Sequence, residues 1–145
     1  KIEKNIMTVD FNRTVTLSDS SGALSFDNIF ASVGNKLTNS NGGITIGAGV
    51  SKVKVGFNLW AATVVDKRVW FTLRRYKSGG EYEYIGDIIS VDRSGFVTGS
   101  ISPVLVNVEE GDYFAVGYSN EASGVGINQA SDNKHATNLT VEVVE

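Results

Sequence analysis

The sequence predicts an all-β sandwich or barrel, and three observations support this fold class. From Gly42 onward, apolar and polar residues alternate with a period of two, which places successive side chains on opposite faces of a strand. Clusters of Gly, Asn, Asp and Ser interrupt this alternation at short intervals, as turns do in sandwiches. No segment of about ten residues has the apolar stripe of an amphipathic helix, and the 16 glycines further disfavour helices.

Length and composition exclude several classes of function. The 145 residues fit one domain, and 41% hydrophobic and 20% charged residues are typical of a globular protein. No apolar run approaches the roughly 18 residues that a membrane helix requires, so we expect no membrane insertion. Cysteine is absent, which excludes disulfides, thiolate metal sites and cysteine nucleophiles. A net charge of −3, with no basic block longer than Arg74-Arg75, argues against a nucleic-acid partner.

The first 35 residues alternate only weakly. "TVDFNRTVTL" (8–17) predicts one or two strands, whereas "SDSSGALSF" (18–26) predicts a loop. Two interpretations of residues 1–35 follow. They are an N-terminal extension or neck, or they add strands to a head domain formed by residues 36–145.

Two central segments show the clearest strand pattern. In "KVKVGFNLWA" (52–61), every second residue is apolar and belongs to a predicted core face, whereas Trp60 points to the other face. In "KRVWFTLRRY" (67–76), Trp70 and Arg74 likewise lie opposite the core face. The predicted core residues are Val53, Val55, Phe57, Leu59, Val69, Phe71 and Leu73.

Further strands are predicted toward the C-terminus. They are "EYEYIGDIISVD" (81–92), "GFVTGSISPVLVNV" (95–108), "DYFAVGYS" (112–119) and "NLTVEVV" (138–144). Turn chemistry separates the strands at 39–43, 64–68, 77–81, 92–95 and 109–112. Pro103 interrupts a long strand pattern, so we expect an edge position or a bulge there, because proline lacks an amide donor.

The turn "EEGD" (109–112) has two interpretations. Glu109, Glu110 and Asp112 stand close together, and paired carboxylates perform acid–base chemistry when their environments separate their pKa values. Alternatively, Gly111 supplies the positive φ of a turn and the aspartate bonds the neighbouring backbone. The spacing does not supply the ligand order of a calcium loop, and we prefer the turn.

Aromatic and polar residues outside the core face are the candidate binding residues. Trp60 and Trp70 point away from the core, where they pack against a second subunit, contact a ligand or cover their own chain. Tyr82 and Tyr84 share a face with Arg74. Flat rings beside planar donors suit hydroxyl-rich ligands, and ordinary cross-strand pairing explains the same mixture.

Two further polar residues belong to the candidate set. Asp87 lies on the strand that carries the tyrosines, beside the same cluster. His135 is the only histidine, so a zinc site would need carboxylates for its other ligands. It is a solvated loop residue or a contact for sugar hydroxyls, because imidazole both donates and accepts hydrogen bonds.

Several segments after Leu37 match a known family. They are "NGGITIGAGVSKVKV" (41–55), "RVWFTLRRY" (68–76), "EYEYIGDII" (81–89), "GSISPVLVNVEEGDYFAVGYS" (99–119) and "NLTVEVV" (138–144). Their order resembles the C1q/TNF-like jelly-roll, a two-sheet sandwich that usually assembles as a trimer. The resemblance implies an all-β jelly-roll β-sandwich over residues 36–145 and a homotrimer.

Within this fold, the opening "GGITIGAGVSKVKV" (42–55) is most similar to head domains of tail and baseplate proteins from phages of Gram-positive bacteria. The chain lacks the Gly-X-Y collagen repeat of the vertebrate branch. The resemblance implies a viral receptor-binding head, located on the virion or otherwise extracellular, that acts in host adhesion. Its partners would be host cell-wall polysaccharide or teichoic acid, through non-covalent carbohydrate binding, and other tail or baseplate proteins.

A second class of function stays open, namely a structural trimerisation or docking domain of a virion or cell-surface protein with no ligand of its own. We expect no enzyme and no cofactor. A polysaccharide depolymerase fits poorly, because the sequence offers no obvious pair of acids apart from the turn chemistry.

Overall fold

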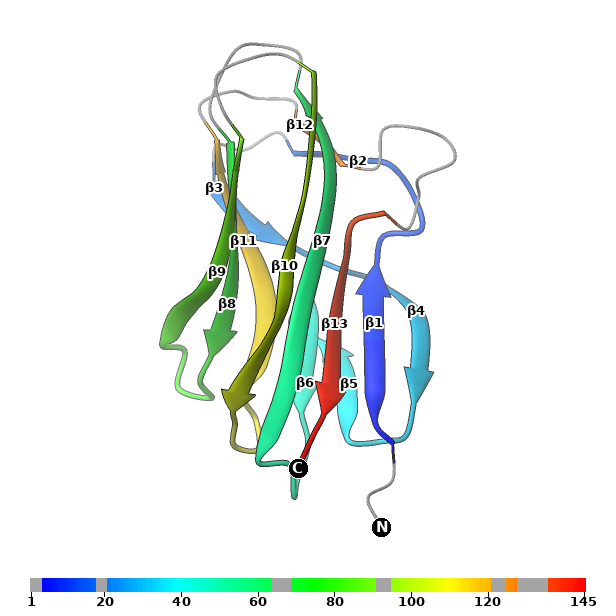
Figure 1. The fold of residues 1–145 in the computed structure, drawn as a ribbon, viewed down its shortest axis with the longest axis vertical. Coiled ribbons are helices and arrows are strands. Elements are labelled where there is room, and N and C mark those ends of the chain that lie inside the picture. Colours follow the sequence, from blue (N-terminus) through cyan, green and yellow to red (C-terminus); the bar gives the residue numbers. More distant parts are fainter. Residues whose placement is uncertain (1–3, 18–20, 64–68, 91–94, 121–124, 128–135) are drawn as a thin grey trace.

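The computed structural model shows a β-sandwich (Figure 1). Among the described residues every regular element is a strand, and none forms a helix long and apolar enough to cross a membrane. The described residues are 4–17, 21–63, 69–90, 95–120, 125–127 and 136–145.

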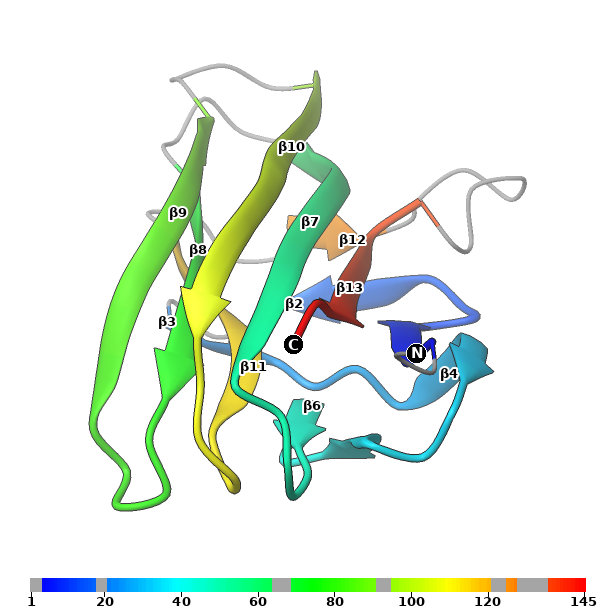
Figure 2. The same ribbon diagram turned by 60° about the horizontal axis from the view of Figure 1, so that its bottom comes forward.

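Two antiparallel sheets form the layers. Sheet A contains, in spatial order, β2 (Val15–Leu17), β12 (Val125–Ile127), β7 (Lys52–Thr63), β13 (Asn138–Val143), β1 (Ile6–Asp10) and β4 (Asn28–Val33), and β10 (Gly95–Asn107) pairs along β7. Sheet B contains β5 (Leu37–Ser40), β6 (Gly43–Ile46), β11 (Tyr113–Asn120), β8 (Val69–Tyr76) and β9 (Tyr82–Ser90), and β3 (Ser21–Leu24) also pairs with β11. The long strands β7 to β10 gather on one side of the sandwich in both views (Figure 1, Figure 2).

The core lies between the sheets and follows the predicted alternation. Val53, Val55 and Phe57 of β7 are fully buried, as are Phe71 and Leu73 of β8. Burial of such side chains contributes roughly 1.5–3 kcal/mol each relative to exposure. The predicted core faces of these strands are therefore confirmed.

The turn chemistry also acts as predicted where the structure describes it. Asn41 and Gly42 form the two-residue loop between β5 and β6, with φ of 57° and 73°. Positive φ at both positions is the geometry of a type I′ hairpin, which favours Asn-Gly. At 77–81 the amide of Lys77 donates to the carbonyl of Glu81 at 2.7 Å. The predicted turn at 64–68, and most of that at 92–95, lie outside the described residues.

The N-terminal segment supplies strands to both sheets. β1 lies between β13 and β4 in sheet A, and its Val9 is fully buried. Asn5 Oδ1 accepts hydrogen bonds from the amides of Asn35 and Lys36, at 3.0 Å each. The loop predicted for 18–26 is wrong at Ser21–Leu24, which pairs with β11 as β3. Its small residues hide the alternation that marks longer strands.

Two bulges shape the outer faces of the sheets. The pairing of β10 with β7 shifts between Ile101 and Val104, so Pro103 lies in a bulge of an edge strand, as predicted. The pairing of β8 with β9 shifts at Leu73/Arg74. A bulge changes which residues face outward, because side chains alternate with a strict period of two.

Candidate functional site

Tyrosines gather on the outer face of sheet B. Tyr76 of β8 pairs with Tyr82 of β9 on one side and with Tyr113 of β11 on the other. Tyr84 follows two residues along β9 and pairs with Arg74. We call Arg74, Tyr76, Tyr82, Tyr84 and Tyr113 the tyrosine platform.

The rings of the platform contact one another in sequence. Tyr76 and Tyr113 stack with centroids 4.6 Å apart and planes 2° from parallel. Tyr76 and Tyr82 are 5.1 Å apart at 40°, and Tyr82 and Tyr84 are 5.5 Å apart at 77°. Each such pair adds about 0.5–1.5 kcal/mol beyond burial. The rings are therefore positioned before any ligand arrives.

Arg74 lies against these rings. Its Cζ is 4.8 Å from the ring centroid of Tyr82 and 5.4 Å from that of Tyr84. Its Nε donates to Thr72 Oγ1 at 3.1 Å, and its Nη1 donates to Tyr76 Oη at 3.2 Å. The guanidinium thus joins two strands and fixes the orientation of the tyrosines through cation–π contacts.

Two rings of the platform are open to solvent. Tyr84 is 62% exposed and Tyr82 is 47% exposed, whereas Tyr76 and Tyr113 are half-buried. A phenol ring combines an apolar face with a hydroxyl that donates and accepts hydrogen bonds. This combination suits a flat ligand that carries both C–H and O–H groups.

Neighbouring groups favour the uncharged form of two phenols of the platform, Tyr82 and Tyr113. A side-chain hydrogen bond with Tyr84, and repulsion from its charged form, raise the pKa of Tyr82 above 10.0, and Arg74 offsets only part of this. Burial raises the pKa of Tyr113, and Tyr76 adds to the effect. Both phenols are therefore protonated at neutral pH.

Three of the predicted site residues meet in the platform. Arg74, Tyr82 and Tyr84 share the outer face of sheet B. Asp87 is exposed and pairs with Thr72 on the same strands. The bulge at Leu73/Arg74 restores an outward position to Asp87, which strict alternation from Tyr84 would have turned inward.

The tryptophans do not join the platform. Trp70 is half-buried on β8, two residues before Thr72, and pairs with Ser119 of β11. Trp60 lies in sheet A, where its amide donates to Thr137 Oγ1 at 2.9 Å and its carbonyl accepts from the same hydroxyl at 3.1 Å. The predicted contact His135 lies outside the described residues.

Sequence reasoning missed Tyr76 and Tyr113. Tyr76 has the same parity as Arg74 along β8, which was a usable signal. Tyr113 follows the "EEGD" turn, and only the pairing of β11 with β8 brings it to Tyr76. Pairing between strands so far apart in sequence is not encoded in local alternation.

A hollow of about 150 Å³ lies beside Tyr82 and is lined by charged side chains. Arg75 Nη2 contacts Glu83 Oε1 at 2.6 Å, and Arg75 Nη1 donates to the carbonyl of Asn107 at 2.6 Å. Lys77 and Glu81 complete the lining. The cations here are engaged by their neighbours.

The "EEGD" corner is a structural turn. Gly111 has φ of 91°, and Asp112 is 2% exposed. Asp112 Oδ2 accepts from the amide of Glu109 at 3.1 Å and from Lys77 Nζ at 3.4 Å. The predicted backbone bond of the aspartate is therefore confirmed. Within the described ranges, no three His, Cys, Asp or Glu side chains cluster in a way that would hold a metal.

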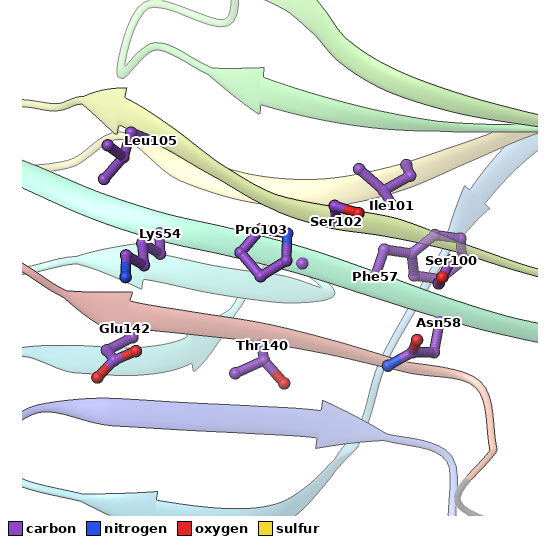
Figure 3. A pocket seen from close by; sticks show the side chains of 11 residues that line it. Lys54, Phe57, Asn58, Ser100, Ile101, Ser102, Pro103, Leu105, Thr140 and Glu142 are labelled. Carbon is purple, nitrogen blue, oxygen red and sulfur yellow. The ribbon is translucent and has the colours of Figure 1, made fainter.

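Sheet A carries a different surface, a groove of about 660 Å³ that crosses β10, β7 and β13 (Figure 3). The bulge at Ser102 and Pro103 borders it opposite Gly56, which has no side chain to fill the space. Lys54 and Glu142 are cross-strand partners at one end. Its lining is Lys54, Gly56, Phe57, Asn58, Ser100, Ile101, Ser102, Pro103, Leu105, Thr140 and Glu142, and we call it the polar groove.

The fold is that of the TNF-like jelly-roll. No protein-family model matches the sequence, and neither does any curated protein sequence. Murine APRIL at pH 5.0 and at pH 8.0 superposes with TM-scores of 0.73 and 0.72 at 12% identity, over 98% of this chain and 100% of each APRIL chain. Eiger TNF from S. frugiperda superposes with a TM-score of 0.73 at 13% identity, over 99% of this chain and 94% of that one. The likeness at this identity is one of fold, and it confirms the predicted C1q/TNF-like sandwich.

Proposed function

We propose that the chain is a homotrimeric, non-catalytic receptor-binding head that attaches to host cell-wall saccharide. The tyrosine platform is the observation that carries this proposal. Its exposed rings offer apolar faces for the C–H side of a sugar ring, and their hydroxyls offer hydrogen bonds at the rim. Asp87 and Trp70, on the same outer face, extend the binding surface beyond the platform.

The distribution of exposed apolar residues supports different roles for the two sheets, one in subunit contacts and the other in ligand binding. The large exposed apolar residues described in sheet A are Ile29, Phe30 and Val33 of β4 and Leu105 of β10, whereas those described in sheet B are Tyr82 and Tyr84. Side chains without a polar group gain most from being covered by a second subunit. We assign subunit contacts to sheet A, Trp60 included, and ligand contacts to sheet B.

Trimerisation would raise the overall affinity of a head whose single sugar sites are weak. A single shallow platform binds weakly, but three copies on one head act together through effective concentration. The C1q/TNF-like fold usually assembles in this way. The "GGITIGAGVSKVKV" opening (42–55) supports a tail or baseplate protein on the virion of a phage with a Gram-positive host, where many heads would add further avidity.

One observation favours the alternative of a structural docking domain. β4 is an edge strand, and its sequence "NIFASV" has neither a charged residue nor a proline. Natural edge strands usually carry such residues to prevent pairing with other chains. An unprotected apolar edge suits another virion component that covers it, with no ligand on the platform.

Glycan binding separates the two functions. Purified wall polysaccharide from a Gram-positive host is titrated into the protein, and the proposal expects saturable binding that Tyr84→Ala weakens at least tenfold. A docking domain would show no saturable binding. Light scattering at micromolar concentration tests the assembly, since the mass of one chain would overturn the trimer.

A further inference from the structure

The charge around the tyrosine platform is acidic. The strands and turns that build it, residues 69–90 and 107–113, carry three cations and six carboxylates. The cations are Arg74, Arg75 and Lys77, and the carboxylates are Glu81, Glu83, Asp87, Glu109, Glu110 and Asp112. A polyanion that approaches this face meets net repulsion within the Debye length of about 10 Å at 0.1 M salt.

The two cations outside the platform are engaged elsewhere. Arg75 is 14% exposed in its side chain and contacts Glu83 at 2.6 Å. Lys77 Nζ lies 3.4 Å from the buried carboxylate of Asp112. A phosphate or carboxylate of a ligand would compete with Glu83 for Arg75 and with Asp112 for Lys77.

Arg74 is held inside the platform. Two of its nitrogens donate to Thr72 and Tyr76, and its guanidinium lies against the rings of Tyr82 and Tyr84. Anion recognition by arginine uses a fork of free, parallel N–H donors. Here Nε and Nη1 are each engaged by the protein, so each adjacent pair of nitrogens has at least one member occupied, and Arg74 acts as a residue that positions the rings.

Gly117 of β11 provides the room for this arrangement. A Cβ added at Gly117 would overlap the Arg74 guanidinium and stand 2.6 Å from its Nε. Gly117 pairs with Thr72, so the guanidinium lies flat over the backbone of the neighbouring strand. A side chain at this position displaces Arg74 and removes the support of Tyr82 and Tyr84.

From these observations we propose that the ligand of the tyrosine platform is a neutral glycan, stacked on Tyr82 and Tyr84, rather than an anionic phosphodiester polymer such as teichoic acid. The inference rests on the proposed function. It also identifies Arg74 and Gly117 as positioning residues. A sugar ring without charge needs no free cation and is not repelled by the surrounding carboxylates.

Matched polymers test the ligand class. Wall polysaccharide is titrated before and after removal of its phosphodiesters with hydrofluoric acid, and poly(glycerol phosphate) is titrated beside it. The proposal expects equal affinity for both polysaccharide samples, no binding of poly(glycerol phosphate), and less than about a twofold change in Kd between about 50 and 500 mM salt. Binding that needs the phosphate and weakens steeply with salt would overturn it while leaving a saccharide-binding head intact.

Variants test the positioning role. Gly117→Ala and Arg74→Ala should each weaken binding about tenfold, and Arg74→Lys should lose as much as Arg74→Ala, because an ammonium neither forks nor stacks in the same way. Gly79→Ala is the control, since nothing lies within 4 Å of a Cβ there. Retained binding in Arg74→Lys together with strong salt dependence would show a direct anion contact instead. Absence of binding to every polymer would reject the proposed function itself.

Discussion

The outer faces of the two sheets are both formed by antiparallel strands, but they carry different side chains. On sheet B, the outward positions of three neighbouring strands carry Tyr82, Tyr76 and Tyr113 in one row. On sheet A, the outward positions of β7 and β13 carry Gly56 and Thr140, and the surface is hollowed. Both sheets contribute apolar side chains to one shared core. The side chains that point outward therefore determine what each face can bind.

The largest effect on stability is expected when the N-terminal segment is removed, because this segment contributes strands to both sheets. A chain of residues 36–145 loses β1, β2 and β4 from sheet A and β3 from sheet B. It also loses buried residues such as Val9 and Phe26. We expect no cooperative thermal transition for this fragment by circular dichroism. A fragment that folds would establish residues 1–35 as an extension outside the head.

A smaller loss of stability is expected from a substitution in the "EEGD" corner, which borders sheet B. Asp112→Ala leaves the amide of Glu109 and the charges of Lys77 and Arg75 without their buried acceptor, which costs about 1–3 kcal/mol of unfolding free energy. Urea denaturation measures this loss. Glu110→Ala, at an exposed position of the same turn, is the control and should change stability by less than about 0.5 kcal/mol. Equal losses in both variants would contradict the structural role of Asp112.

A loss of binding with only a moderate loss of stability is expected when the two exposed rings are removed. Tyr82→Ser with Tyr84→Ser should weaken saccharide binding by at least tenfold, or about 1.4 kcal/mol. The loss of the Tyr76–Tyr82 and Tyr82–Tyr84 ring contacts should lower the melting temperature by several degrees. Asn58→Ala, in the polar groove, should leave the affinity of each site unchanged. Isothermal titration calorimetry and differential scanning calorimetry provide both readouts. A larger loss for Asn58→Ala would move the binding site to sheet A.

The smallest effect is expected from pH. The pKa values of Tyr82 and Tyr113 are raised above 10.0, so both groups favour the neutral form in the folded protein. Their contribution is fully present below the ordinary pKa and is lost only as pH rises through the raised values. Affinity for a neutral polysaccharide should therefore stay constant from about pH 6 to 9 and fall above about pH 10. A decline that begins near pH 7 would contradict this.

The sequence predicts which face of a strand is buried better than it predicts which residues meet on the outer surface. Alternation predicted the buried faces of β7 and β8, and the turn residues at 39–43 predicted a turn there, because each depends on neighbouring residues. Alternation also placed Arg74 with Tyr82 and Tyr84. It could not bring Tyr113 to Tyr76, because that contact depends on pairing between β8 and β11.

Glycine has two roles in this fold, and only one of them can be predicted from the sequence. Gly111 stands in a recognisable turn, where its positive φ is expected. Gly117 stands inside a strand, where its lack of a side chain matters only because Arg74 lies over it. Requirements of this kind come from a neighbouring strand and become visible only in the folded chain.

Tyrosine ring signals test the central claim, that sheet B carries the ligand. Four of the five tyrosines lie in the platform, and the fifth, Tyr118, is buried in the core and serves as an internal control. The protein is labelled with ¹³C at tyrosine rings and titrated with wall oligosaccharide while NMR spectra are recorded. We predict saturable shifts of the Tyr76, Tyr82, Tyr84 and Tyr113 rings with no shift of Tyr118. Saturable binding that leaves all the platform rings unperturbed would contradict this account.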